Sequence, residues 1–443
     1  MSIDNASDFS PLLFSETSEI EDTDELKTRP DQPSTVSLSL LSFVFGLVQT
    51  LPLAILIPVS LATGLSTIQA SLIISAWPVS SLLSLFLQPS FNRMGKVPYL
   101  CLTGTTCSLS FCSFYLSVHW DRYSFLFAAI AARFLSGTAL FLINNKVAVG
   151  LTDHLRGNVE RASALYEVFN SAGQAAGAFV GSVVYAAMGF DRTMLVAGGI
   201  TAISVVLLGC ILPGSGPATS GDEVLAKREV LSSRSFYRLH VTKHMLMYCW
   251  CPMLCIGACM VFVEGILTQF YLTTYSKSLG FGGILLGESG VLYSVSAIVI
   301  GSLRAIFPIL TDVGLVSGLL IGGLSLLFIG PYLPIPAIPD LYTSIGGFNL
   351  LLVSSCAIQL NSITVSARSL NKHTSTLANG QAISVTMNAA NVAYNCGAFV
   401  GPVLGGWLLG LVQYAEVFAL GAAPMVLVGV GVGCTMLLNG NSG

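Results

Sequence analysis

The chain has 443 residues, of which 53% are hydrophobic and 9% are charged, and its formal net charge at pH 7 is -3. Soluble domains carry about 25% charged residues, so a folded chain of this composition cannot cover its surface with polar groups. The composition therefore places the protein in a lipid bilayer, and the small negative charge excludes the basic footprint of a nucleic-acid-binding protein.

The first 36 residues differ from the rest, with nine Asp or Glu, two Lys or Arg and no long apolar run. We expect residues 1–36 to form a disordered acidic tail on the cytosolic side of the membrane. Within it, Asp8 followed after three residues by Leu12 and Leu13 resembles the acidic dileucine signal of endolysosomal traffic. This resemblance implies a clathrin adaptor as a partner, although so short a pattern also arises by chance.

From residue 37 onward, apolar segments of about 20 residues recur, each long enough to cross the bilayer as a helix. They predict an all-α membrane protein with an N-terminal six-helix bundle over 37–213, a cytosolic linker over 214–245 and a C-terminal six-helix bundle over 246–437. The twelve predicted spans are 37–62, 68–90, 97–118, 124–150, 160–186, 193–213, 246–272, 283–306, 314–332, 341–364, 380–408 and 413–437.

Lysine and arginine predict the orientation, because loops rich in these residues stay in the cytosol. The loops that follow the even-numbered spans contain eleven Lys or Arg, counting Arg161 at the edge of the fifth span, against three in the opposite loops. Both termini are therefore expected to be cytosolic.

The pentapeptide GAFVG occurs at Gly177–Gly181 in the fifth span and again at Gly397–Gly401 in the eleventh. Glycine- and alanine-rich helices can produce such a match by chance, but its place in equivalent spans favours an internal repeat. Internal repeats are typical of transporters, whose substrate site lies between the halves. Small residues four apart also let two membrane helices approach closely.

Several stretches resemble the major facilitator superfamily, and within its drug:proton antiporter branch the vesicular amine and polyamine transporters. They are "FNRMGKVPYL" after the second span, "RFLSG" in the fourth, "RGNV" and "GSVVY" around the fifth and "CGAFVGPVLGG" in the eleventh. The resemblance implies the major facilitator fold, proton-coupled antiport into an acidic vesicle, and a proton-coupling role for Arg133. It assigns conformational roles to Arg93, Gly95, Gly177, Gly181, Gly397, Gly401 and Pro402.

The chain departs from this family at its acidic positions. Vesicular monoamine carriers have carboxyls where this chain has Gln49, Ser354 and Asn391, whereas the acid of the seventh span is present as Glu264. Transport of a monoamine is therefore in doubt, and we expect Gln49 to contact the solute in place of an acid.

Glu264 lies deep in the seventh span, where an ionisable residue predicts function. Thr268 and Tyr271 follow it on the same helical face, as do Met253, Gly257 and Met260 before it. We expect this face to be a cavity wall in which Glu264 exchanges a proton for a cation while Thr268 and Tyr271 bind the solute. The alternative is a structural acid that is hydrogen-bonded to a neighbouring helix.

Two further polar stripes are candidates for the cavity lining. The fifth span has Glu167 as a second proton-coupling carboxyl, although an acid near a helix end can also be simply solvated. The solute-binding candidates of the two stripes are Asn170 and Gln174 in the fifth span and Asn388, Asn391 and Asn395 in the eleventh. Hydrogen bonds between helices are the alternative role for these amides.

Lys146 lies about 20 Å beyond Arg133 along the fourth span. It fits either a side chain that snorkels to the cytosolic rim or a cavity cation that suits an anionic solute. Cys251, Cys255 and Cys259 share one face of the seventh span, where packing is a simpler explanation than a metal site. No metal, cofactor or enzymatic activity is expected.

The sequence thus predicts a secondary transporter that works by alternating access, with a small organic solute, protons and the lipid bilayer as its partners. We expect a vesicular or endolysosomal membrane, with the plasma membrane as the alternative. An organic-anion or drug carrier of the same fold, or a non-transporting membrane sensor or scaffold, are the other functions that the sequence leaves open.

Overall fold

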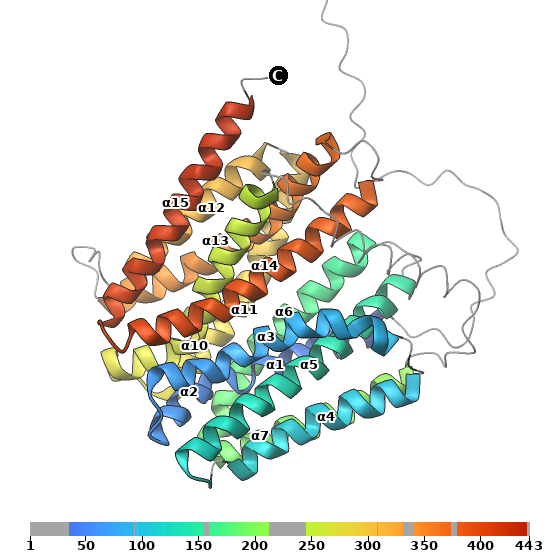
Figure 1. The fold of residues 1–443 in the computed structure, drawn as a ribbon, viewed down its shortest axis with the longest axis vertical. Coiled ribbons are helices and arrows are strands. Elements are labelled where there is room, and N and C mark those ends of the chain that lie inside the picture. Colours follow the sequence, from blue (N-terminus) through green and yellow to red (C-terminus); the bar gives the residue numbers. More distant parts are fainter. Residues whose placement is uncertain are drawn as a thin grey trace, which may run out of the picture.

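The computed structural model describes residues 35–92, 94, 96–117, 119–154, 159–211, 245–307, 309–330, 340–373 and 379–440. The acidic tail with Asp8, Leu12 and Leu13 lies outside these residues, as do Arg93, Gly95 and the linker between the two halves. All regular elements of the described residues are helices (Figure 1).

The helices divide into two halves of the chain. The first half contains α1 (Thr35–Thr50), α2 (Leu53–Ala62), α3 (Thr67–Asn92), α4 (Lys96–Ser117), α5 (Arg122–His154), α6 (Val159–Met188) and α7 (Phe190–Ile211). The second half contains the π-helical turn η1 (Leu246–Trp250), α10 (Cys251–Tyr275), α11 (Leu279–Ile306), α12 (Leu310–Ile329), α13 (Asp340–His373), α14 (Asn379–Leu408) and α15 (Tyr414–Gly440).

Each predicted span corresponds to an α-helix, except that the first corresponds to α1 and α2 and the seventh to η1 and α10. The chain turns at Leu51 and Pro52, because a proline has no N–H to donate to the carbonyl of Val48 four residues earlier. Elsewhere side chains mark where helices begin: Asp121 accepts hydrogen bonds from the backbone N–H of Tyr123 and Ser124 before α5. Proline and capping residues thus set the ends of the spans.

Among the described residues, nine stretches are long and apolar enough to cross a membrane. The helices α4, α6 and α14 are too polar to meet that measure, although they complete the set of twelve spans. α6 and α14 carry the GAFVG repeats, and both face the interface between the two halves. Polar side chains directed inward explain why these two helices are less apolar than the others.

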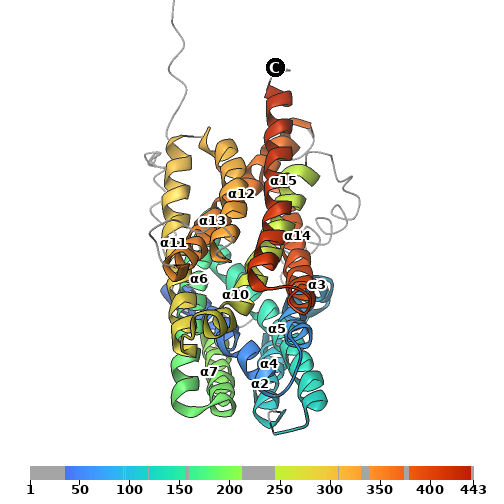
Figure 2. The ribbon, with the colours of Figure 1, turned by 90° about the vertical axis from the view of Figure 1, so that its left-hand side faces the viewer.

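The twelve spans form two six-helix bundles, which lie one above the other in Figure 2. Inside the bundles, α6 packs on α1 and α14 packs on α10. Between the bundles, α6 packs on α11, α3 on α14 and α2 on α10. The repeated helices α6 and α14 therefore contact both bundles.

The glycines of the repeat explain the closest contacts. A Cβ at Gly177 or Gly181 of α6 would lie about 2 Å from the carbonyl oxygen of Leu47 or Leu51 in the first span, too close for any side chain. Gly397 and Gly401 of α14 meet the carbonyl oxygens of Leu254 and Ala258 on α10 in the same way. The glycines of the second half lie 220 residues after those of the first, and the carbonyls that they contact lie 207 residues after those contacted in the first half. The same helix–helix contact therefore occurs in both halves.

Candidate functional site

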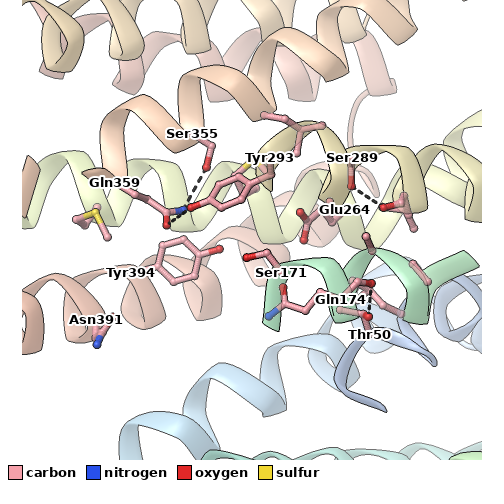
Figure 3. Close-up of a pocket in the computed structure, with 18 residues that line it drawn as sticks. Thr50, Ser171, Gln174, Glu264, Ser289, Tyr293, Ser355, Gln359, Asn391 and Tyr394 are labelled. Carbon is pink, nitrogen blue, oxygen red and sulfur yellow. Dashed lines mark hydrogen bonds between the residues drawn. The ribbon is translucent and has the colours of Figure 1, made fainter. Parts of the chain in front are cut away.

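A cavity of about 240 Å³ lies between the two bundles (Figure 3). α1, α2 and α6 line it from the first half, and α10, α11, α13 and α14 line it from the second. The lining residues are Thr50, Leu53, Ser171, Gln174, Ala175, Ala178, Met253, Met260, Glu264, Leu286, Ser289, Gly290, Tyr293, Leu352, Ser355, Gln359, Asn391 and Tyr394.

Glu264 gives this cavity its charge. Among the lining residues that the structure describes, it is the one with a charge, and none of them is Lys, Arg or His. Its side chain is partly buried near the middle of α10 and makes no hydrogen bond or ion pair with any described residue. A charged group at the centre of a membrane helix costs about 3 kcal/mol on insertion scales, so an unpaired carboxyl here calls for a proton or a cationic partner.

Hydrogen-bonding side chains surround this carboxyl. The Tyr293 hydroxyl on α11 donates to Oε1 of Gln359 on α13 at 2.8 Å. The Gln359 amide nitrogen donates to the Ser355 hydroxyl at 3.3 Å. The three side chains link two helices along one cavity wall, and the Gln359 amide has a second N–H that can donate to a solute (Figure 3).

The two halves contribute equivalent positions to the cavity. Ser171 and Gln174 on α6 lie 220 residues before Asn391 and Tyr394 on α14, and all four side chains line the cavity. On the first-half side, the Thr50 hydroxyl donates to the Gln174 carbonyl at 2.5 Å, which ties α1 to α6. The repeat therefore builds two facing walls from matching places in the two bundles.

The structure brings together three of the expected proton- and solute-binding residues, namely Gln174, Glu264 and Asn391. Met253 and Met260 of the expected cavity wall also line the cavity. The structure places other candidates of the same stripes outside the cavity. Thr268 is buried against Gly282 of α11 with its hydroxyl unpaired. Tyr271 is also buried, and its hydroxyl lies 3.0 Å from the hydroxyl of Ser344. Neighbouring helices therefore cover the face of α10 on the C-terminal side of Glu264.

The remaining amides face other surroundings or lie outside the described side chains. Asn170 is buried against Gly46 of α1, and Asn395 donates to the backbone carbonyl of Asn391 at 2.8 Å. Gln49 precedes the lining residue Thr50 but does not itself line the cavity. The side chains of Glu167 and Asn388 lie outside the part of the structure that is described.

The cations of the fourth span face the interior of the first bundle. Arg133 is 3% exposed, lies over the Trp77 ring at 4.8 Å, and has Nε and Nη1 without hydrogen-bond partners. The Lys146 ammonium lies 5.0 Å from the centre of the Tyr99 ring. Neither residue lines the cavity, so no cation for an anionic solute is contributed by this span.

The sequence interpretation missed seven polar lining residues, which are Thr50, Ser171, Ser289, Tyr293, Ser355, Gln359 and Tyr394. Gln359 and Tyr293 offered a signal, since polar side chains at membrane depth mark interfaces or pathways. The serines offered none, because a serine in a helix can also bond its own backbone, as Ser289 does to the Leu286 carbonyl.

The thiols of α10 pack in the protein interior. Cys255 and Cys259 are buried, and the Cys259 thiol points to the Gly421 carbonyl on α15 at 3.8 Å. The described residues contain no group of three or more His, Cys, Asp or Glu side chains that could hold a metal ion.

Comparisons with known proteins agree with this architecture. The model of the Major Facilitator Superfamily matches residues 38–391. The "MFS-type transporter SLC18B1" of Rattus norvegicus is 25% identical over 282 residues, and that of Mus musculus 24%. Both alignments cover 62% of this chain and 57% of the relative, so the chain matches little more than half the length of these relatives.

Solved structures share the fold at low sequence identity. The nucleoside transporter NupG superposes with a TM-score of 0.64 at 11% identity, over 91% of this chain and 98% of that chain. A point mutant of the same transporter gives a TM-score of 0.64 at 12% identity, over 90% of this chain and 99% of that chain. These superpositions show a common fold.

Proposed function

The chain belongs to the Major Facilitator Superfamily, a family of multi-pass membrane transporters, and from this premise we propose that it is a proton-coupled antiporter of a small organic cation. The solute is an amine or a polyamine-like molecule that is loaded into an acidic vesicle. Transport follows alternating access, in which the two bundles rock about the cavity between them.

Glu264 carries this proposal. An unpaired carboxyl in a cavity whose described lining has no Lys, Arg or His can hold a proton or a cationic solute, but a single carboxylate cannot hold both at once. Competition between the two ligands couples their opposite movements across the membrane. The neutral hydrogen-bonding groups of Tyr293, Gln359 and Asn391 bind the rest of the solute. This part of the binding does not depend on the protonation state of Glu264.

The substitution Glu264→Gln tests the coupling, because it keeps the side chain's shape and fixes the site in a neutral form. We expect it to abolish uphill, proton-driven uptake into reconstituted liposomes, while downhill exchange of the same solute persists. Labelled amines, polyamines and organic anions are compared under an imposed pH gradient. Uphill uptake by Glu264→Gln at the wild-type rate would place the coupling carboxyl elsewhere, with Glu167 as the next residue to substitute.

Glu416→Gln is the matched control. Glu416 lies in the first turn of α15, where it accepts a hydrogen bond from the Gln413 backbone, and it does not line the cavity. Glu416→Gln removes one carboxyl, as Glu264→Gln does, but it should leave uphill uptake unchanged. Uptake of anions alone would favour an organic-anion carrier, and absence of flux under every gradient would favour a sensor or scaffold.

A further inference from the structure

A second carboxyl lies at membrane depth, outside the cavity. Glu288 on α11 is exposed and shares a helical stripe with Ile284, Val291 and Val295, which are 53%, 59% and 51% exposed. By the helical rise, it lies about 14 Å from the start of α11 and about 27 Å from its end. The stripe is apolar on both sides of Glu288, so this carboxyl faces lipid.

Asn349 on α13 is the neighbour of this carboxyl. Its amide nitrogen donates to Oε1 of Glu288 at 3.3 Å, and it joins the two helices at this depth. The amide oxygen of the same residue is buried and has no hydrogen-bond partner. The Asn349 amide and the Glu288 carboxyl are therefore joined by one hydrogen bond, and the Asn349 amide oxygen beside it lacks a donor.

Among the residues that the structure describes, no cation pairs with Glu288. The cationic side chains described on α11 and on the helices packed against it are Arg304, which donates to the Leu360 carbonyl, and Arg368, which pairs with Asp312. Arg304 lies about 24 Å further along α11. Glu264 and Asp340, the other acids described on the packed helices, have no hydrogen bond or ion pair to Glu288.

An ionised carboxylate facing lipid without a cation is costly, whereas a protonated carboxyl fits the pair. Its O–H can donate to the free amide oxygen of Asn349 while its carbonyl oxygen accepts from the amide nitrogen, so that both groups are satisfied. We propose that Glu288 is a second proton-binding site, which lies outside the solute cavity, is reached from the bilayer and holds its proton against Asn349.

This site goes beyond the transport proposal, because it depends on neither the solute nor the coupling at Glu264. Neither Glu288 nor Asn349 lines the cavity, so the proton held there does not compete with a solute. Glu264 and Glu288 then form two separate proton sites in membrane-spanning helices, one exposed to the cavity and one to lipid.

A lipid-soluble carbodiimide tests the proposal, because it reacts with protonated carboxyls in apolar surroundings. The acid O–H adds across one C=N bond, and the adduct rearranges to a stable N-acylurea without a leaving group. We expect dicyclohexylcarbodiimide to label Glu288 in liposomes at neutral pH, as located by peptide mass spectrometry, and a water-soluble carbodiimide to leave it unlabelled. Lack of labelling at Glu288 by the lipid-soluble reagent overturns the proposal.

Infrared spectroscopy provides a second readout that needs no transport. Wild-type protein at neutral pH should show a carboxylic acid C=O band that is lost in Glu288→Gln and kept in Glu264→Gln. Asn349→Leu should shift this band to higher frequency, since the acid loses its hydrogen-bond partner, and it replaces Glu288→Gln as the test if that variant does not fold. A band that neither variant changes shows that Glu288 holds no proton.

Discussion

At the scale of single residues, two carboxyls in membrane-spanning helices meet different surroundings. Glu264 lines a cavity together with hydroxyl and amide groups, whereas Glu288 lies among exposed aliphatic side chains and meets one amide. The transport proposal has the first site exchange its proton for a solute, since the cavity leaves room beside the carboxyl. The second favours a neutral acid because lipid does not solvate a charge.

From the Tyr293–Gln359 hydrogen bond we predict that loss of the Tyr293 hydroxyl weakens solute binding. Tyr293→Phe removes the hydroxyl that orients the Gln359 amide at 2.8 Å, and one such bond contributes about 1 kcal/mol. We expect the KM for solute uptake to rise about fivefold while the pH dependence of uptake is kept. Tyr342→Phe, at a side chain that is 65% exposed on α13, is the control, and an equal KM for both variants would contradict the role given to Tyr293.

At the scale of elements, the repeated glycines decide which helices pack together. In α6 and α14 they bring the helix backbones against carbonyl oxygens of α1 and α10. Packing of small residues replaces the hydrophobic effect as the attraction between helices in lipid. These two helices can therefore carry polar residues toward the cavity and still be held in place.

The α1–α6 contact predicts a difference between two glycine substitutions. A Cβ at Gly177 would lie 2.1 Å from the Leu47 carbonyl oxygen, whereas a Cβ at Gly199 of α7 meets nothing within 4 Å. Gly177→Ala should lower the thermal unfolding temperature in detergent, since the helices must separate. Gly199→Ala should keep or raise it, because alanine favours a helix by about 1 kcal/mol over glycine.

Equal unfolding temperatures for the two variants would mean that α1 and α6 can separate without loss of stability. Gly401→Ala extends the test to the second half, where a Cβ would lie 2.1 Å from the Ala258 carbonyl oxygen. If the halves are equivalent, its unfolding temperature should fall together with that of Gly177→Ala.

At the scale of the whole molecule, the two bundles meet through close contacts of small residues. On α11, Gly283, Gly287 and Gly290 lie against α6, where a Cβ at Gly290 would lie 2.3 Å from the Cβ of Ala175. Gly406 of α14 similarly faces Ser71 of α3. Surfaces of this kind can separate without leaving large side chains unpacked, which suits a mechanism in which the bundles rock against each other.

The membrane in which the protein resides is predicted from the acidic tail, residues 1–36. Leu12→Ala combined with Leu13→Ala should move a tagged full-length protein from internal membranes to the cell surface, because the pair fits an adaptor-binding signal with Asp8. Imaging and surface biotinylation measure the shift. Ser10→Ala, at a variable position of the same pattern, is the control, and an unchanged distribution of the double variant would rule out the signal.

The sequence by itself determined the class of the protein and the course of its chain. The hydropathy of a segment is a sum over its own residues and does not depend on the helices that pack against it. The twelve spans and the placement of GAFVG in α6 and α14 could therefore be predicted. The same reasoning identified Glu264, because a carboxyl in an apolar run stands out in any context.

Only the tertiary structure decided which polar side chains meet. Thr268 and Tyr271 continue the stripe of Glu264, yet Gly282 and Ser344 of neighbouring helices cover them. Tyr293 and Gln359 line the cavity instead, although their polarity alone did not show whether they face a cavity or another helix. Helical periodicity fixes which residues share a face, but crossing helices cover one part of that face and leave another open. That choice depends on close contacts between segments far apart in the chain, which no local pattern contains.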